Sequence, residues 1–359
     1  MTNHDIIQLR LINQQLIKPS FAKPHELASY MGCMQAQDFY GAKWAIGTRI
    51  KGITDALIEK EFDEGKIIRT HVLRPTWHFL AAGDVGWMLK LTAPRIKLLS
   101  AGYHRRNGID SAIIKQSQKI FEDALTGGKQ LSREELMPLF KNLNIKTGDN
   151  HLSFLLLEAE LDGLICSGAR KGKQFTYALL EERVPKLKYL NREEAVAELA
   201  KRYFISRGPA TVQDFAWWSG LSLTDAKKGI ELNKQGLIGE TVSGETYWFS
   251  PAINSEQKYR NEARLLPAFD EYLIAYKNRA LSLNPGQGVI TGNGIFKPTL
   301  ILNGRVTGTW KRADKKDKVL IEVDPFIKLS KLATKKIFTE AKNYGKFLGK
   351  KSEVKLASV

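Results

Sequence analysis

Residues 211–249 read TVQDFAWWSGLSLTDAKKGIELNKQGLIGETVSGETYWF, and this stretch carries the signals that decide the fold. Thr211-Val-Gln-Asp214 and Ser222-Leu-Thr-Asp225 each place a hydroxyl three residues before a carboxylate. Such pairs satisfy the free amides of a helix's first turn. Farther on, two short β-type runs flank Ser243-Gly244, which favours a hairpin. Helices followed by a hairpin are typical of a winged-helix unit, a relative of the helix-turn-helix.

The same order of signals occurs twice earlier in the chain. In each copy a helix-like stretch runs into a Gly, the residue that best supplies a left-handed helix cap, and β-type runs then flank a turn. Repeated supersecondary units are a strong indication of architecture. The two copies are residues 162–177, preceded by the helix start Ser132-Arg-Glu-Glu135, and residues 64–79, preceded by a helix with Pro24 at its first position.

The last quarter of the chain has a different pattern. It contains β-type runs and two Asn-Gly turns, and it ends in a basic, helix-like stretch from Leu329 to Leu348. The runs are Gly288-Val-Ile-Thr291, Thr299-Leu-Ile-Leu302 and Val319-Leu-Ile-Glu-Val323, with the turns at Asn293-Gly294 and Asn303-Gly304.

The chain is therefore predicted to be an α+β protein of tandem winged-helix units followed by a small β-rich domain. The predicted boundaries are winged helix 1 at about 1–100, winged helix 2 at 101–190, winged helix 3 at 191–255, and the β-rich domain with its basic C-terminal helix at 256–359.

Charge and composition narrow the function. The 359 residues include 55 Lys and Arg against 38 Asp and Glu, a formal charge of +17, which favours a polyanionic partner such as DNA over a merely basic protein. Only Cys33 and Cys166 are present, which excludes a disulfide scaffold and a cysteine-based zinc site and fits a reducing cytoplasm. No apolar run approaches the roughly 20 residues of a membrane span, and the N-terminus does not resemble a signal peptide.

Standard catalytic motifs are missing. Gly127-Gly128-Lys129 lacks the hydroxyl of a phosphate-binding loop and is interpreted as a helix end and turn. The six histidines form no metal-ligand pattern, and Asp38, Asp55 and Asp63 do not form a recognisable Mg²⁺ set. We therefore expect no cofactor, and either a metal-independent reaction or no catalysis.

Two strings stand out as candidate sites. In Gln35-Ala36-Gln37, followed by Asp38, the two amides share one face of a strand but diverge by about 200° on a helix. A bent backbone would aim both into one cleft, and the alternative is a solvated helix start. The second string, Arg69–Phe79, lies in the first predicted wing. Its side chains suit phosphates and exposed bases, although its aromatic residues also fit a hairpin core. Its candidate DNA contacts are Arg69, Arg74, Thr76, Trp77 and His78. Two further candidates, Lys277 and Arg279, lie elsewhere in the chain, after Tyr272.

At these strings the chain resembles the bacterial winged-helix DNA-binding family that includes the AlkZ-type alkylpurine DNA glycosylases. The resemblance implies tandem winged helices and a β-rich domain around a concave, basic DNA-binding channel. It also implies that Gln35-Ala36-Gln37 corresponds to a catalytic Gln-apolar-Gln motif. The strings that carry it are Met34–Asp38 with Trp44–Gly47, Arg69–Phe79, Gly208–Gly220, Leu265–Tyr272 and Asn303–Trp310.

The implied activity is hydrolysis of the N-glycosidic bond of purines alkylated at N7 or N3, extending to interstrand crosslinks. A cationic purine is already a good leaving group, so two neutral amides that orient water would suffice. In this hypothesis Gln37 orients the water and Gln35 supports it or contacts the deoxyribose. Asp38 either stabilises the sugar cation or serves only the helix start.

We expect a monofunctional glycosylase, because no Lys stands out as a Schiff-base nucleophile, and Lys43 lies beyond the motif. The expected partner is damaged double-stranded DNA, bound by a monomer in a bacterial cytoplasm at the nucleoid. A non-catalytic winged-helix DNA-binding protein or regulator is the first alternative. The second is a protein–protein scaffold, since fold does not fix function.

Overall fold

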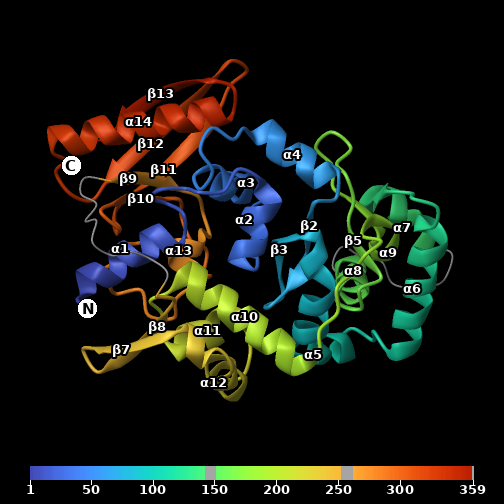
Figure 1. The fold of residues 1–359 in the computed structure, drawn as a ribbon. Coiled ribbons are helices and arrows are strands. Elements are labelled where there is room, and N and C mark those ends of the chain that lie inside the picture. Colours follow the sequence, from blue (N-terminus) through green and yellow to red (C-terminus); the bar gives the residue numbers. More distant parts are fainter. Residues whose placement is uncertain (142–150, 252–261, 358–359) are drawn as a thin grey trace.

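The computed structural model describes residues 1–141, 151–251 and 262–357. Over these residues the chain is a mixed α+β protein whose strands form four separate sheets (Figure 1). This confirms the α+β class. Within the described residues, no helix is long and apolar enough to cross a bilayer.

The first part of the chain holds a three-stranded antiparallel sheet of order β1-β3-β2, surrounded by helices. Pro24 occupies the start of α2, as predicted. The elements are α1 (Asn3–Asn13), α2 (Pro24–Met31), β1 (Met34–Gln35), α3 (Phe39–Gly47), α4 (Asp55–Asp63), β2 (Ile67–Val72), β3 (Thr76–Ala81), the 3₁₀ turn η1 (Ala82–Asp84) and α5 (Val85–Arg106).

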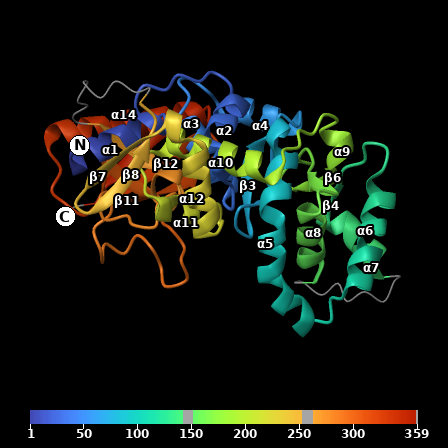
Figure 2. The ribbon, with the colours of Figure 1, turned by 60° about the horizontal axis from the view of Figure 1, so that its bottom comes forward.

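The second part repeats a three-stranded sheet, of order β4-β6-β5, beside helices that project to one side of the molecule (Figure 2). Gly127 and Gly128 form a turn after α6, and their amides donate to the Glu182 carboxylate. This confirms the interpretation of the Gly-Gly-Lys string as a turn. The elements are α6 (Ser111–Leu125), β4 (Leu131–Ser132), α7 (Arg133–Lys141), α8 (His151–Leu161), β5 (Ile165–Ser167), β6 (Thr176–Leu179) and α9 (Leu180–Arg183).

The third part has helices followed by a hairpin, which is the predicted order. Thr211 and Ser222 are the N-caps of α11 and α12, and the hairpin turns at Ser243 and Gly244, both with positive φ. The elements are α10 (Arg192–Arg207), α11 (Val212–Ser219), α12 (Leu223–Leu232), η2 (Lys234–Gly236), β7 (Ile238–Val242) and β8 (Glu245–Phe249).

The last part is a five-stranded sheet of order β13-β12-β11-β10-β9, with α14 packed on it (Figure 1). The predicted strand at 288–291 is wrong: Ile290 forms only an isolated bridge to Phe296 around the Asn293-Gly294 turn. The run begins with Gly288 and is flanked by Gly286, Gly292 and Gly294, and glycine weakens a strand. The elements are β9 (Ala263–Leu266), α13 (Glu271–Ile274), β10 (Thr299–Leu302), β11 (Arg305–Asp314), β12 (Lys318–Pro325), α14 (Lys331–Phe347) and β13 (Lys351–Leu356).

Two hydrophobic cores join parts that are distant in sequence. One packs the β2–β3 hairpin and α5 against α10 and α11. The other packs α2, α3 and β1 against the five-stranded sheet and α14. Ala36, between β1 and α3, belongs to the second core, and Cys33, just before β1, belongs to the first, so the position of this segment depends on both cores.

Candidate active site

The Gln-Ala-Gln segment forms a strand-to-helix junction. Gln35 ends β1 opposite His78 of β3, and the Ala36 amide donates to the Trp77 carbonyl at 2.7 Å. The chain then bends, and α3 begins only at Phe39, because Asp38 is its N-cap. Gln35 is half-buried and Gln37 is exposed. The segment is therefore neither a regular strand nor the expected helix start, but the bent backbone that was one of the alternatives.

Several contacts fix the backbone of this segment. The Gln35 amide donates to Glu271 Oε1 at 2.8 Å, and the Ala36 carbonyl accepts from Arg69 Nε at 3.0 Å. The side-chain amides of Gln35 and Gln37, in contrast, form no hydrogen bond with any described residue. A fixed backbone with free amides suits a ligand or a water molecule, since each amide offers both donors and an acceptor.

Glu271 is the centre of a buried network behind β1. Its Oε2 accepts from the Arg207 guanidinium at 2.6 Å and from the Trp218 indole at 3.0 Å. Arg207 also donates to the carbonyls of Met31 and Cys33. The network therefore holds the chain on both sides of the turn that leads into β1. Its members are distant in sequence, and no local signal in the sequence indicates that they meet.

One face of the small sheet gathers unpaired polar groups. The register and the alternation of strand side chains place Gln35, His78 and Thr76 on the same face. Burial, helped by nearby Arg74, lowers the pKa of His78 from 6.5 to about 3, so this imidazole is neutral. Its Nδ1 donates to the Thr76 carbonyl at 2.8 Å. Thr76 Oγ1 and Arg74 Nε are buried without a hydrogen-bond partner among the described residues, which is uncommon unless a ligand or water binds there.

The opposite face holds Arg69 and Trp77. The Arg69 guanidinium lies between the rings of Trp77 and Phe175, at 4.3 and 4.7 Å from their centroids. Burial lowers its pKa to about 10. Trp77 is half-buried and also packs against His71. Arg69 thus supports the Ala36 backbone. Arg69 and Trp77 lie on the face of the sheet opposite Thr76 and His78, so the predicted DNA contacts do not form one group.

Asp38 is the N-cap of α3. Its Oδ1 accepts from the Gly41 amide at 3.1 Å, while the residue stays exposed. Two arginines missed by the sequence analysis lie around it. Arg312 of β11 interacts electrostatically with Asp38, and Arg170, before β6, donates to the Tyr40 hydroxyl at 3.1 Å. The five-stranded sheet and the second part of the chain therefore both reach this segment.

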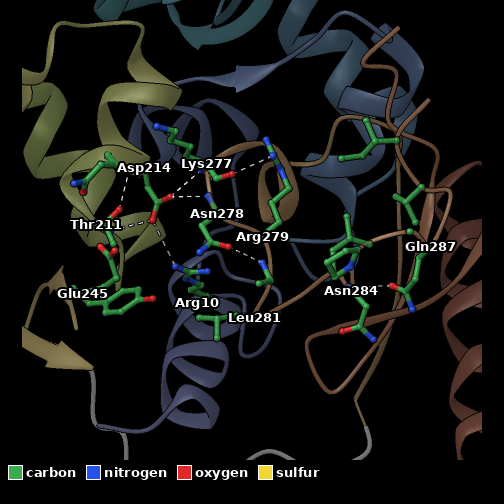
Figure 3. Close-up of a pocket in the computed structure, with 18 of the residues that line it drawn as sticks. Arg10, Thr211, Asp214, Glu245, Lys277, Asn278, Arg279, Leu281, Asn284 and Gln287 are labelled. Atoms are coloured by element: carbon green, nitrogen blue, oxygen red, sulfur yellow. Dashed lines mark hydrogen bonds and ion pairs between the residues drawn. The ribbon is translucent and has the colours of Figure 1, made fainter. Parts of the chain in front are cut away.

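Lys277 and Arg279 lie on a separate cavity of about 790 Å³ (Figure 3). Its wall includes Asp214, which accepts from the backbone amides of Thr211 and Lys277 and lies 3.8 Å from the Arg10 guanidinium. Lys277 is exposed, whereas the Arg279 guanidinium lies over Trp217. Neither Gln35 nor Gln37 lines this cavity. Arg279 lies near the β2–β3 hairpin, because its guanidinium and that of Arg74 both lie over the Trp217 ring.

Comparison with known proteins adds the family. A structure of a DNA glycosylase, AlkZ of Streptomyces sahachiroi, superposes with a TM-score of 0.82 over 99% of this chain and 100% of that one, at 20% identity. The chain thus has the fold of a DNA glycosylase. An interstrand DNA cross-link repair glycosylase of the same organism is 23% identical over 340 residues, 88% of each chain. The family described as DNA glycosylase AlkZ-like matches residues 28–347, and the chain belongs to this family.

Proposed function

We propose that the chain hydrolyses the N-glycosidic bond of cationic N7- or N3-alkylated purines in duplex DNA, including those in interstrand crosslinks. The observation that carries the proposal is the pair of unpartnered amides, Gln35 and Gln37, on a backbone fixed by Glu271 and Arg69. Membership of the AlkZ-like family and the name of the cross-link repair relative support the substrate class.

The chemistry asks little of the protein. An alkylated purine leaves as a neutral base, so the site must place water at the anomeric carbon and tolerate a developing sugar cation. Gln37, exposed beyond the end of β1, orients that water, and half-buried Gln35 contacts the deoxyribose. The free Oδ2 of Asp38 stabilises the cation electrostatically.

The reaction is hydrolytic and leaves an abasic site. The Lys43 ammonium is buried and paired with Asp55 at 2.8 Å and with Glu59. An amine that is enclosed and held by two carboxylates does not serve as a Schiff-base nucleophile. The proposed mechanism requires no metal ion.

The proposed architecture is three winged-helix units and a β-rich domain, with the boundaries given above, around a basic channel. Helices α5 to α8 and the loop between α13 and β10 project toward the same side in Figure 2, with the β2–β3 hairpin and α11 between them. Duplex DNA would lie along this side and meet Arg74, Arg279 and Lys277, bound by a monomer.

Substrate comparison tests the proposal. Purified protein, with EDTA present, is incubated with duplexes that carry N7-methylguanine, neutral hypoxanthine or an N7-linked interstrand crosslink, and released base and unhooked strands are measured. Release from the two cationic substrates, with none from hypoxanthine, is the expected result. Equal release from the neutral lesion would contradict amide-only catalysis, and tight DNA binding without any release would favour a non-catalytic DNA-binding protein.

A further inference from the structure

Trp217 is an exposed aromatic residue in an unusual setting. It lies on α11 with 43% of its surface accessible, whereas its neighbour Trp218 is fully buried. Two guanidinium groups from distant segments lie over its ring. Arg74, in the turn of the β2–β3 hairpin, and Arg279, after α13, each lie 5.7 Å from the ring centroid.

The two arginines are only partly balanced by the protein, because Glu271 attracts Arg74 and Asp214 attracts Arg279 electrostatically without an ion pair. Neither forms an ion pair with a carboxylate among the described residues, and Arg74 Nε is buried without a partner. The guanidiniums also repel each other, because Arg74 lowers the pKa of Arg279 beyond the effect of burial. Two guanidiniums held together with no carboxylate in direct contact are typical of a site whose anion is supplied by the ligand.

This group is rigidly connected to the Gln segment. A Cβ added to Gly220, at the end of α11, would lie 2.5 Å from the Leu73 carbonyl, so α11 touches the hairpin turn that carries Arg74. Trp218, one residue from Trp217, donates to Glu271, whose other oxygen accepts from the Gln35 amide. An exposed aromatic surface beside two cations that form no ion pair with a described residue therefore has a fixed position relative to Gln35.

We propose that Trp217 packs against a nucleoside of the lesion-bearing DNA strand while Arg74 and Arg279 bind its two flanking phosphates. The inference rests on the proposed function and adds a contact that fixes the position of the DNA strand relative to Gln35 and Gln37. Aromatic residues stack on any base, and guanidiniums match phosphate oxygens, so the group recognises the backbone and one base without reading sequence.

Binding to an undamaged duplex and to a single strand of the same sequence tests this without any glycosylase activity. Affinities are measured by fluorescence anisotropy across a series of KCl concentrations for wild type, Arg74→Gln, Arg279→Gln and the double variant. Each single change is expected to reduce the salt slope by about 0.9, and the double change by about twice that, because each loses one phosphate contact. Arg192→Gln, whose guanidinium already pairs with Asp225 at 2.9 Å, is the matched control and should leave the slope unchanged.

Trp217 is tested by a second readout. Trp217→Ala is expected to weaken binding about 10-fold without changing the salt slope, and Trp217→Phe to restore most of the affinity, as stacking predicts. DNA should quench part of the tryptophan fluorescence of wild type, and Trp217→Phe should abolish that part. Unchanged affinity in Trp217→Ala, or Arg variants that match Arg192→Gln, would overturn the proposal. If the binding results are as expected but the wild-type protein releases no base from alkylated DNA, the proposed function is refuted and the DNA contact is not.

Discussion

Glu271 is the side chain on which the position of Gln35 most directly depends. Its two oxygens connect the Gln35 amide to Arg207 and Trp218, and the group is 1% exposed. A buried carboxylate needs all of its donors, since an unmatched lone pair or charge in the interior is costly. The geometry of the candidate catalytic residue is thus set by residues that do not touch substrate.

Trp218→Phe should therefore lower kcat as well as stability. It removes one donor from Glu271 and should cost about 2 kcal/mol of folding free energy. It should also reduce kcat about 10-fold or more while KM stays constant, because catalytic groups tolerate little displacement. Trp87→Phe is the matched control, since the buried Trp87 indole donates to Asp84 at 3.0 Å in the same way. Equal kcat in the two variants would argue against positioning through Glu271.

His78 should make the fold sensitive to acid. Its folded pKa of about 3 lies below the ordinary value of 6.5, so only the unfolded chain takes up the proton as pH falls below 6.5. The resulting loss of stability between pH 7 and pH 5 is about 2 kcal/mol. Denaturant unfolding at the two pH values should show this loss in wild type and a smaller loss, by about that amount, in His78→Asn. The same pH dependence in both proteins would contradict a buried neutral His78.

At the scale of elements, local signals in the sequence predicted most starts and turns. The capping residues Thr211 and Ser222 begin α11 and α12, and the Asn303-Gly304 turn joins β10 to β11. Strands that depend on distant partners were not predicted. β1 and β9 are short and acquire strand structure only by pairing with β3 and β10, and β13 lies parallel to β12 after a helix. Two- to six-residue edge strands carry too little pattern to be identified alone.

Contact between α11 and the β2–β3 hairpin is tested by glycine substitution. Gly220 has φ +70°, and its added Cβ would meet the Leu73 carbonyl at 2.5 Å, whereas Gly52 has φ +77° and no atom within 4 Å. Gly52→Ala should cost about 1 kcal/mol through backbone strain alone, and Gly220→Ala about 3 kcal/mol through strain and overlap. Gly220→Ala should also weaken DNA binding by displacing Arg74. Equal destabilisation of the two variants in thermal unfolding would show that the hairpin turn yields freely.

At the scale of the whole molecule, the site is built where all parts of the chain meet. Individual candidates such as Gln35, Arg74 and Arg279 could be selected from composition and motif. That Arg69 faces away from Thr76, or that Trp217 joins Arg74 to Arg279, depends on sheet register and on packing between α11 and the hairpin. Neither is encoded locally, which is why Glu271, Trp217 and Arg312 were missed.

A buried ion pair joins the segment after α3 to the start of α13. Arg49, just after α3, forms two hydrogen bonds with Asp270, at 2.8 and 2.7 Å, and neither side chain is more than 1% exposed. Asp270→Ala should cost about 3–5 kcal/mol, because it leaves the Arg49 charge buried without a partner. Adding Arg49→Met should recover most of that loss. Denaturant unfolding measures both, and a loss below about 1 kcal/mol in Asp270→Ala would refute a structural role for the pair.

The most direct test of the account is single-turnover release of N7-methylguanine from duplex DNA by wild type, Gln35→Ala and Gln37→Ala, with DNA affinity measured in parallel. Wild type should release the base. Gln37→Ala should release it about 100-fold more slowly or worse at unchanged affinity, the loss expected when an oriented hydrogen-bonding group is removed. Gln35→Ala should show a smaller loss of rate. Wild-type rates in Gln37→Ala would contradict the assignment of the chemistry to the Gln pair.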